Sequence, residues 1–355
     1  MSNPMTKTDD FFFNVPCAIG TQGSQPFMLL SVPFRALRRL LVLDNSGHVL
    51  DRSQRELNPA RVRKIGRYLT DAMQNGQPFI LPPLIGNCNS PIRFVESDVS
   101  GVGRAELPMD AVIELFDGQH RSNAIIQYCS SVDTGNQIGL MLFQNVGLKQ
   151  RQQFFSDINN TATKPSAAIS MAYDTRDELA RTVKAMIGDS PALAAITDFE
   201  HNTVPAASEH LVSFKPLCDA TGRFIGAGDE RLDQGQIGAI WASWMQLTGA
   251  ATVQGIRIGE YRKEFIQFYG VMLNAFGLAV QTLRKSLSPS DVAAQIALTG
   301  NGADQETKEH FFALTAWEGC CVMRTETGFK IQADIAAQRR AAARLTDAMQ
   351  AGQLG

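Results

Sequence analysis

The stretch Asp117-Gly118-Gln119-His120-Arg121 lies between two segments of opposite character. Before it, residues 111–116 are apolar and partly β-branched, a composition typical of a largely buried strand. After it, residues 122–129 place their apolar side chains at helical spacing. The pattern therefore predicts a strand, a polar turn and a helix in that order, at the centre of an α/β arrangement.

Four polar side chains and one glycine fall on that predicted turn. Gly118 allows the backbone to pass close to a ligand, and the first N–H groups of the helix carry a partial positive charge. With His120 and Arg121 beside them, these groups predict a phosphate-binding site. Asp, Ser and Gly also occur in plain capped turns, so any two of these residues would fit an ordinary connection. All five together, directly after a buried strand, favour a site.

Other segments of the first half predict further elements of an α/β alternation. Asn58 and Pro59 are usual residues at a helix start, and Asn75 with Gly76 is usual at a helix end. Residues 157–166 are polar and show no periodicity, which indicates a loop. The remaining predicted elements are a hairpin of 11–19 and 27–32 joined through 20–23, a helical piece at 34–41, a strand at 79–85, a loop or hairpin at 88–110, a strand at 138–144 and a helix at 148–158.

The character of the chain changes near residue 165, where long helical patterns begin. These patterns predict helices over 167–187, 234–247, 260–287, 306–323 and 332–349. We therefore predict an α+β protein in three parts. They are a disordered N-terminus at 1–10, an α/β domain with a mixed sheet at 11–165 and an all-helical domain at 166–355.

The composition is that of an ordinary globular protein, with 44% hydrophobic and 19% charged residues over 355 positions. No apolar run is as long as a membrane span, and residues 1–10 lack the basic-then-apolar order of a signal peptide. The six cysteines show no metal-binding spacing, since Cys320 and Cys321 are adjacent and the others lie far apart. These features predict a cytoplasmic protein with reduced thiols, no membrane partner and no metal site.

Basic residues are concentrated in one part of a chain whose net charge is −2. Between Arg35 and Arg67 there are nine basic residues and three acids. A local basic patch on a nearly neutral chain suits selective contact with a phosphate backbone, and a solvated helix face is the alternative. The residues that we assign to an interface with double-stranded DNA are Arg35, Arg38, Arg39, Arg55, Arg61, Arg63, Lys64 and Arg67.

Several stretches together resemble the DGQHR-domain family of DndB-type proteins, a branch of the ParB/sulfiredoxin-like superfamily. The resemblance covers about residues 10–230 and rests on 55–62, 82–84, 117–121, 154–159, 163–166 and 173–177. It implies a ParB-like N-terminal domain and a regulatory or accessory role in a bacterial DNA phosphorothioation cluster, in which sulfur replaces a non-bridging phosphate oxygen. Such a protein would bind promoter DNA and limit expression of the cluster. Relatives in other modification clusters, including those that insert deazapurine bases, imply ATP hydrolysis as an alternative.

The resemblance and the residue chemistry together predict a role for each residue of the turn. Arg121 would make a bidentate contact with a pair of phosphate oxygens, and His120 would donate a second hydrogen bond. Gln119 would be a neutral donor, and Asp117 would either cap the helix or orient Arg121. If both strand-end loops meet at one edge of the sheet, the other side of the cleft would be closed by Asp157, Asn159, Asn160 and Lys164.

Three functions stay open at this point, and a DNA-binding transcriptional repressor is the favoured one. In the second, a nucleotide hydrolase or nuclease, Asp117, His120 and Arg121 would be catalytic with ATP and Mg²⁺ as cofactors, whereas a binding protein needs none. Neither a Walker A sequence nor a helix-turn-helix is recognisable. The third is a scaffold that binds other DNA-modification proteins through the helical half. A homodimer is expected by analogy with proteins that bind symmetric operators.

Overall fold

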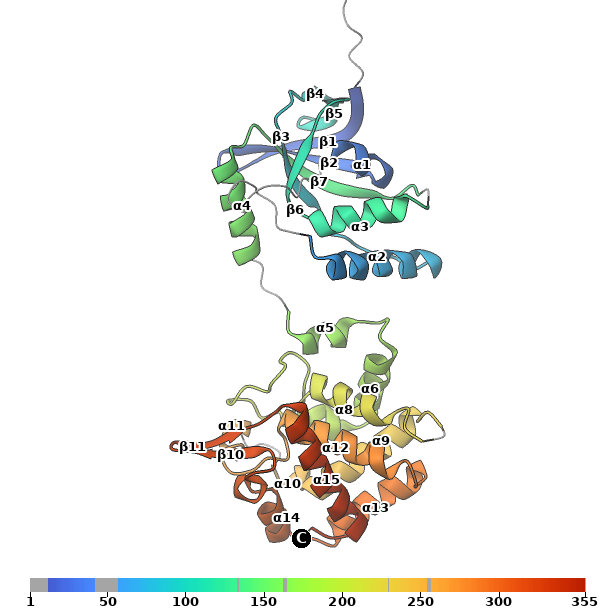
Figure 1. The fold of residues 1–355 in the computed structure, drawn as a ribbon, viewed down its shortest axis with the longest axis vertical. Helices are drawn as coiled ribbons and strands as arrows, with labels where there is room; N and C mark the ends of the chain where they lie inside the picture. Colours follow the sequence, from blue (N-terminus) through green and yellow to red (C-terminus); the bar gives the residue numbers. More distant parts are fainter. Residues whose placement is uncertain are drawn as a thin grey trace, which may run out of the picture. The chain divides into compact units, whose positions relative to one another are not determined.

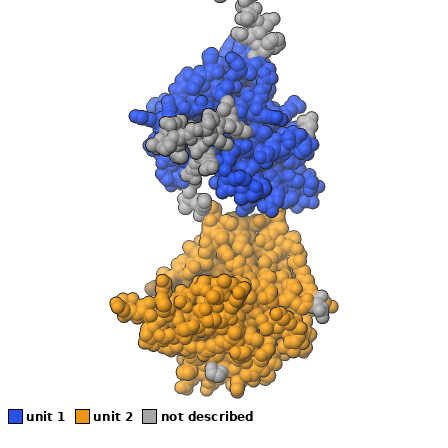
Figure 2. All heavy atoms as spheres, viewed as in Figure 1, with its two compact units in different colours: residues 1–163 blue, residues 164–355 orange. Residues whose placement is uncertain are grey.

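The computed structural model describes residues 12–41, 57–132, 134–161, 165–228, 230–253 and 257–354. The chain divides into two compact units, Met1–Thr163 and Lys164–Gly355, coloured blue and orange in Figure 2. The predicted disordered segment 1–10 and the predicted site residues Arg55 and Lys164 lie outside the described residues.

The first unit is built on a mixed seven-stranded sheet with helices on both faces (Figure 1). Its strand order is β4-β5-β1-β2-β7-β3-β6, and β7 and β3 form the parallel pair among otherwise antiparallel described neighbours. The strands are β1 (Phe12–Gln22), β2 (Gln25–Pro33), β3 (Leu84–Cys88), β4 (Arg93–Glu96), β5 (Val102–Pro108), β6 (Ile113–Asp117) and β7 (Gln137–Gln144). The helices are η1 (Phe34–Ala36), α1 (Leu37–Leu40), α2 (Pro59–Gln74), α3 (Gln119–Cys129) and α4 (Leu148–Thr161).

Side chains that alternate along β6 contribute to two separate cores, because neighbouring strand residues point to opposite faces of a sheet. Leu115 packs into the core that also holds Ile125 of α3 and Leu69 of α2. Phe116 faces the other way, where its ring lies 6.1 Å from that of Phe154 on α4. Helices α1 to α3 therefore cover one face of the sheet and α4 covers the other.

The predicted elements before the central turn are largely confirmed. β1 and β2 form the predicted hairpin, which turns at Gly23 and Ser24, both at positive φ. Helix α2 begins at Pro59 behind the Asn58 cap. The strand predicted at 79–85 starts only at Leu84, since the two prolines before it have no N–H for a ladder. The 88–110 excursion is the hairpin β4–β5.

The loop predicted at 157–166 is wrong in its first part, because α4 continues to Thr161. Asn159 Nδ2 donates to the Phe155 carbonyl at 2.7 Å, and Asn160 Nδ2 donates to Ser156 Oγ at 3.0 Å. These polar side chains are thus satisfied by the preceding turn of their own helix. Phe154, Phe155 and Ile158 pack beside Phe116 and hold the helix on the sheet.

The second unit is mostly helical, as predicted, but it also contains two small two-stranded sheets, so "all-helical" was too strict. One is parallel and the other is an antiparallel hairpin. Its elements are α5 (Ala167–Tyr173), α6 (Glu178–Gly188), α7 (Pro191–Ile196), β8 (Thr197–Asp198), β9 (Val212–Ser213), α8 (Phe214–Phe224), α9 (Gln234–Thr248), α10 (Ala250–Val253), α11 (Ile258–Tyr261), α12 (Gly270–Leu283), α13 (Pro289–Asn301), α14 (Gln305–Phe312), η3 (Leu314–Trp317), β10 (Val322–Thr325), β11 (Gly328–Ile331) and α15 (Ile335–Ala351).

Three of the long helices predicted in this half are interrupted. The 167–187 helix breaks before Asp177, whose side chain caps α6 by accepting from the Ala180 N–H. The 260–287 helix breaks where Arg262 donates to the carbonyl oxygens of Val204 and Phe268. The 306–323 helix ends at Phe312 and gives way to η3 and β10. In the first two, polar side chains satisfy backbone groups at the break, which apolar spacing does not reveal.

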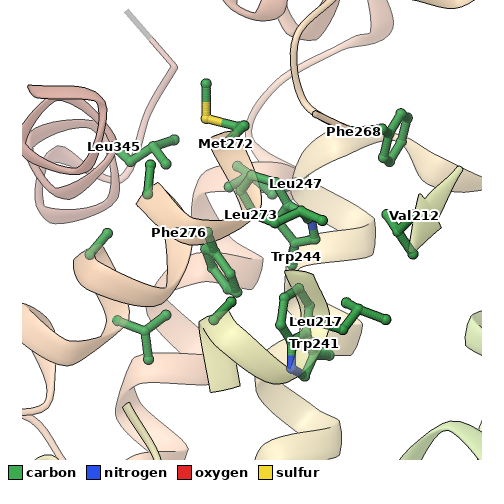
Figure 3. Close-up of a cluster of buried hydrophobic side chains, with 14 of the residues drawn as sticks. Val212, Leu217, Trp241, Trp244, Leu247, Phe268, Met272, Leu273, Phe276 and Leu345 are labelled. Atoms are coloured by element: carbon green, nitrogen blue, oxygen red, sulfur yellow. The ribbon is translucent and has the colours of Figure 1, made fainter. Parts of the chain in front are cut away.

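A buried aromatic cluster organises the second unit (Figure 3). Trp244 of α9 lies 4.4 Å from Phe276 of α12, and Trp241 lies 5.3 Å from the same ring. The Trp241 indole N–H donates to Thr221 Oγ1 at 2.9 Å, so its polar atom is satisfied. No helix in the described part of the chain is both long and apolar enough to cross a membrane.

Candidate functional site

The central turn joins β6 to α3 in three consecutive residues. Asp117 ends the strand, Gly118 is the N-cap of the helix at φ 95° and ψ 10°, and Gln119 begins the helix. Within the described structure no side chain caps this helix end. The N-terminus of α3 therefore presents its partial positive charge beside the turn.

Arg121 and Asp117 form an ion pair one helical turn apart. Arg121 Nη2 lies 2.6 Å from Asp117 Oδ2 and also donates to the Pro83 carbonyl at 2.9 Å. Both side chains are partly accessible, at 19% and 27%. Arg121 Nε is buried and has no hydrogen-bond partner among the described residues. Asp117 thus orients the guanidinium and does not cap the helix, which decides between the two roles considered for it.

His120 connects the turn to the start of α2. Its Nε2 accepts a hydrogen bond from the Asn58 N–H at 3.1 Å, which requires the ring to carry a proton on Nδ1. The Asn58 side chain in turn accepts from the N–H groups of Ala60 and Arg61. The N-termini of α2 and α3 are therefore held side by side, with their positive dipole ends together.

A small cavity lies where the two helix starts meet. Its volume is about 70 Å³. That is well below the several hundred cubic ångströms of pockets that enclose a whole small molecule, so it suits one ligand group. The residues that line it are Arg61, Ile65, Phe116, Asp117, Gly118, Gln119, His120, Arg121, Phe155 and Asn159.

The predicted meeting of two strand-end loops at one sheet edge is wrong. β6 runs antiparallel to β3, with Asp117 opposite Ile85, whereas β7 runs parallel to β3. The ends of β6 and β7 consequently lie at opposite edges. Helix α4 nevertheless brings the chain back toward the turn from the far end of β7, because its 14 residues span about 20 Å. Arg151 of α4 pairs with Glu114 of β6 and holds the helix in place.

Of the described residues predicted for the far side of the cleft, only Asn159 lines the cavity. Asp157 and Asn160 are exposed near the end of α4 and are not among the lining residues. Asp157 accepts a hydrogen bond from Gln153, four residues earlier on the same helix. The wall that α4 provides is therefore made by Phe155 and Asn159.

The lining also contains residues that the sequence pattern did not single out. Ile65 and Phe155 carry the apolar spacing of their helices, and Phe116 carries that of its strand, so each was expected simply in a core. No periodicity distinguishes a core side chain from one at the rim of a cavity.

The described basic residues assigned to DNA are all exposed. They form two groups, one on η1 and α1 and one on α2, and both η1 and α2 pack against α3. None of them is in an ion pair with another described residue. Arg61 lies at the cavity, while Arg63, Lys64 and Arg67 occupy the side of α2 opposite its buried Val62 and Leu69.

Asn58 is expected to matter for the position of α2. Its replacement by alanine removes the acceptor for two helix N–H groups and should cost about 1 kcal/mol of local stability. Asn58→Asp keeps an acceptor in the same place and should cost only a few tenths. Amide hydrogen exchange along α2 measures both variants. Equal protection in the alanine and aspartate proteins would contradict the capping role.

The comparison with protein-family models matches residues 15–297 to DndB, described as DNA-sulfur modification-associated. The match covers more than half of the 355 residues. The chain belongs to the DndB family. This confirms the resemblance drawn from the DGQHR turn and places the protein among those associated with DNA sulfur modification. No curated protein and no solved structure was found to match it.

Proposed function

We propose that this DndB-family protein binds double-stranded DNA and represses the promoter of its DNA sulfur-modification cluster, with one backbone phosphate held at the 117–121 turn. The observation that carries the proposal is the cavity between two adjacent helix N-termini, lined by Arg61, His120 and Arg121. Helix N-termini and guanidinium groups are the usual protein partners of phosphate oxygen. A second copy of the chain and other proteins of the cluster are proposed as further partners.

The charges at the cavity favour an anion. Two guanidinium groups and the uncapped N-terminus of α3 line the cavity with one carboxylate, Asp117, whose charge is already paired with Arg121. The small volume admits a phosphate group and leaves the rest of a nucleic acid outside. A single phosphate of a DNA backbone can enter a cavity of this size, because the adjoining nucleotides extend over the protein surface.

The exposed basic residues extend the contact beyond the cavity. Arg63 and Arg67 are four residues apart on α2 and therefore share a helix face, with Lys64 beside them. Since these side chains are not held by acids of the described structure, they are available to pair with phosphates. Phosphate contacts position a protein on DNA and carry no sequence information, so this surface accounts for affinity rather than base specificity.

A salt titration tests the proposal with the full chain. Binding of a fluorescent duplex from the promoter, followed by anisotropy, should weaken steeply with salt, at about 0.9 decades of affinity per decade of salt for each phosphate contact. Three or more contacts would give a slope of about −3 or steeper. A flat salt dependence, or no binding at low salt, would refute the regulator.

The hydrolase alternative fits the site less well. Among the described residues, no group of three His, Cys, Asp or Glu side chains could hold a metal ion, and Asp117 is the one carboxylate of the cavity. This donor set does not fit a protein-held Mg²⁺. We expect phosphate release from ATP and Mg²⁺ to be no faster with the wild type than with Arg121→Ala. Turnover that disappears in Arg121→Ala would establish the enzyme and overturn the pure binding function.

A further inference from the structure

A turn of the second unit, between η3 and β10, holds two adjacent cysteines. Cys320 and Cys321 follow Gly319, which has φ 78°, and the N–H groups of both cysteines donate to the Trp317 carbonyl, at 3.1 and 3.2 Å. Cys320 is partly exposed, whereas Cys321 is 0% exposed. The Cys321 thiol donates a hydrogen bond to the Cys320 sulfur. One sulfur is therefore accessible to small reagents, and the second lies in contact with it.

Two arginines of α15 lie beside this turn. Arg340 Nε donates to the Cys320 carbonyl at 2.8 Å, and Arg344 Nη1 donates to the Ala316 carbonyl. The Arg344 guanidinium also lies over the Trp317 ring, with its central carbon 4.5 Å from the ring centroid. Both positive charges are therefore held near the thiol by backbone and aromatic groups.

These contacts favour the thiolate form of Cys320. The hydrogen bond from Cys321, together with the two guanidinium charges, lowers the pKa of the Cys320 thiol to about 7 against the opposing effect of burial. Cys321 keeps its proton, because donation of that hydrogen bond and burial raise the pKa of its thiol. Glu318, an acid of the same turn, is paired with Arg324 at 3.2 Å. Since a thiolate is the reactive form of cysteine, Cys320 is the nucleophile of the pair.

We infer that Cys320 is a site of reversible oxidation by hydroperoxides, with Cys321 as the thiol that completes a disulfide. This inference concerns the second unit and does not depend on the proposed DNA binding. The Cys320 thiolate attacks the terminal peroxide oxygen, the O–O bond breaks, and the leaving oxygen takes a proton from solvent. The Cys321 sulfur then attacks the sulfenic acid of Cys320, the S–O bond breaks, and the hydroxyl group leaves with the Cys321 proton as water. The two sulfurs are oxidised, and the hydroperoxide is reduced to water or an alcohol.

The disulfide between adjacent residues should be easy to reduce. The Cα atoms of neighbouring residues lie about 3.8 Å apart across a trans peptide bond, whereas most disulfides join Cα atoms about 4.4–6.8 Å apart. A bridge outside this range is strained, and strain favours its reduction. A thiol reductant should therefore return both cysteines to the reduced form.

Mass spectrometry of the full chain after hydrogen peroxide treatment tests the inference. Tryptic peptide 309–324 contains both cysteines. In the wild type we expect this peptide to lose two hydrogen atoms and to regain them with dithiothreitol, which does not reverse oxidation of Met323. In Cys321→Ala the oxidation should stop at a sulfenic acid that dimedone traps, and in Cys320→Ser neither product should form. A wild-type peptide without the dithiothreitol-reversible loss would overturn the inference, even if a variant fails to fold.

Substitution of Arg340 tests the role of the guanidinium charges. Arg340→Gln should slow disulfide formation at pH 7 about two- to threefold, because a higher thiol pKa leaves less thiolate. Arg340→Lys keeps the charge and should keep the wild-type rate. Arg339→Gln is the matched control, since it removes the same charge from the neighbouring exposed position of α15. Equal rates in Arg340→Gln and Arg339→Gln would overturn activation of the thiol by Arg340.

Discussion

Replacing Gly118 with alanine is expected to lower the stability of the first unit by about 2–6 kcal/mol. Gly118 has φ 95°, a conformation that costs an L-residue about 1–3 kcal/mol. A Cβ at this position would also lie 2.5 Å from Leu84 Cδ2 and 3.1 Å from Arg121 Nη2. Leu84 is fully buried, so moving it adds about 1–3 kcal/mol of packing strain. The variant should in addition displace Arg121 and weaken anion binding.

Gly76→Ala is the matched control for this prediction. Gly76 also has positive φ, at 61°, but a Cβ there would meet nothing within 4 Å. Its cost should be the backbone strain alone, about 1–2 kcal/mol. Hydrogen exchange of the β6 and α3 amides in urea measures the free energy of unfolding of the first unit. All three tryptophans lie in the second unit, so tryptophan fluorescence should not change in either variant. Equal costs at the two positions would show that contact with Leu84 is unimportant.

Removing the charges on the outer side of α2 is expected to have the largest effect on DNA binding. In Arg63→Ala/Lys64→Ala/Arg67→Ala, three exposed cations that form no ion pair with a described acid are lost. If each contacts one phosphate, the salt slope should become shallower by about 2–3, and the affinity near 0.1 M salt should fall by about 10²-fold or more. Anisotropy titrations of the promoter duplex at several salt concentrations measure both quantities.

The control removes the same charge from the second unit. Lys285, Lys330 and Arg339 are exposed, and their triple alanine variant has the same net charge as the α2 variant. If net charge alone governed binding, both variants would lose affinity equally. The proposed interface requires the α2 variant to lose far more. Unchanged affinity in the α2 variant would exclude this helix from the DNA contact, whatever the control does.

The central turn was predictable because its signals are local. An apolar run, a glycine and a helical spacing follow one another directly, and the structure has β6, Gly118 and α3 at those positions. The start of α2 was predictable for the same reason, since Asn58 and Pro59 act within one helical turn. The predicted helices failed where distant groups intervene, as at Arg262, which donates to Val204 some sixty residues away in the chain.

Only part of the site could be predicted from the sequence. Residues 117–121 are consecutive, whereas Arg61 and Ile65 come from α2 and Phe155 comes from α4. The prediction that Asp157 and Asn160 line the cleft assumed that the two strands run in the same direction. In the structure β6 is antiparallel to its neighbour, and the return path along α4 brings Asn159 to the cavity and leaves the other two side chains in solvent.

By itself the sequence determined the family, the α+β class and the polar turn with its helix N-terminus, because each depends on residues adjacent in the chain. Strand direction depends on pairing between residues far apart, and periodicity is the same for both directions. Only the tertiary structure therefore decided that the starts of α2 and α3 adjoin through Asn58 and His120. Only the tertiary structure, likewise, brought Ile65 of α2 and Phe155 of α4 to the cavity beside the turn.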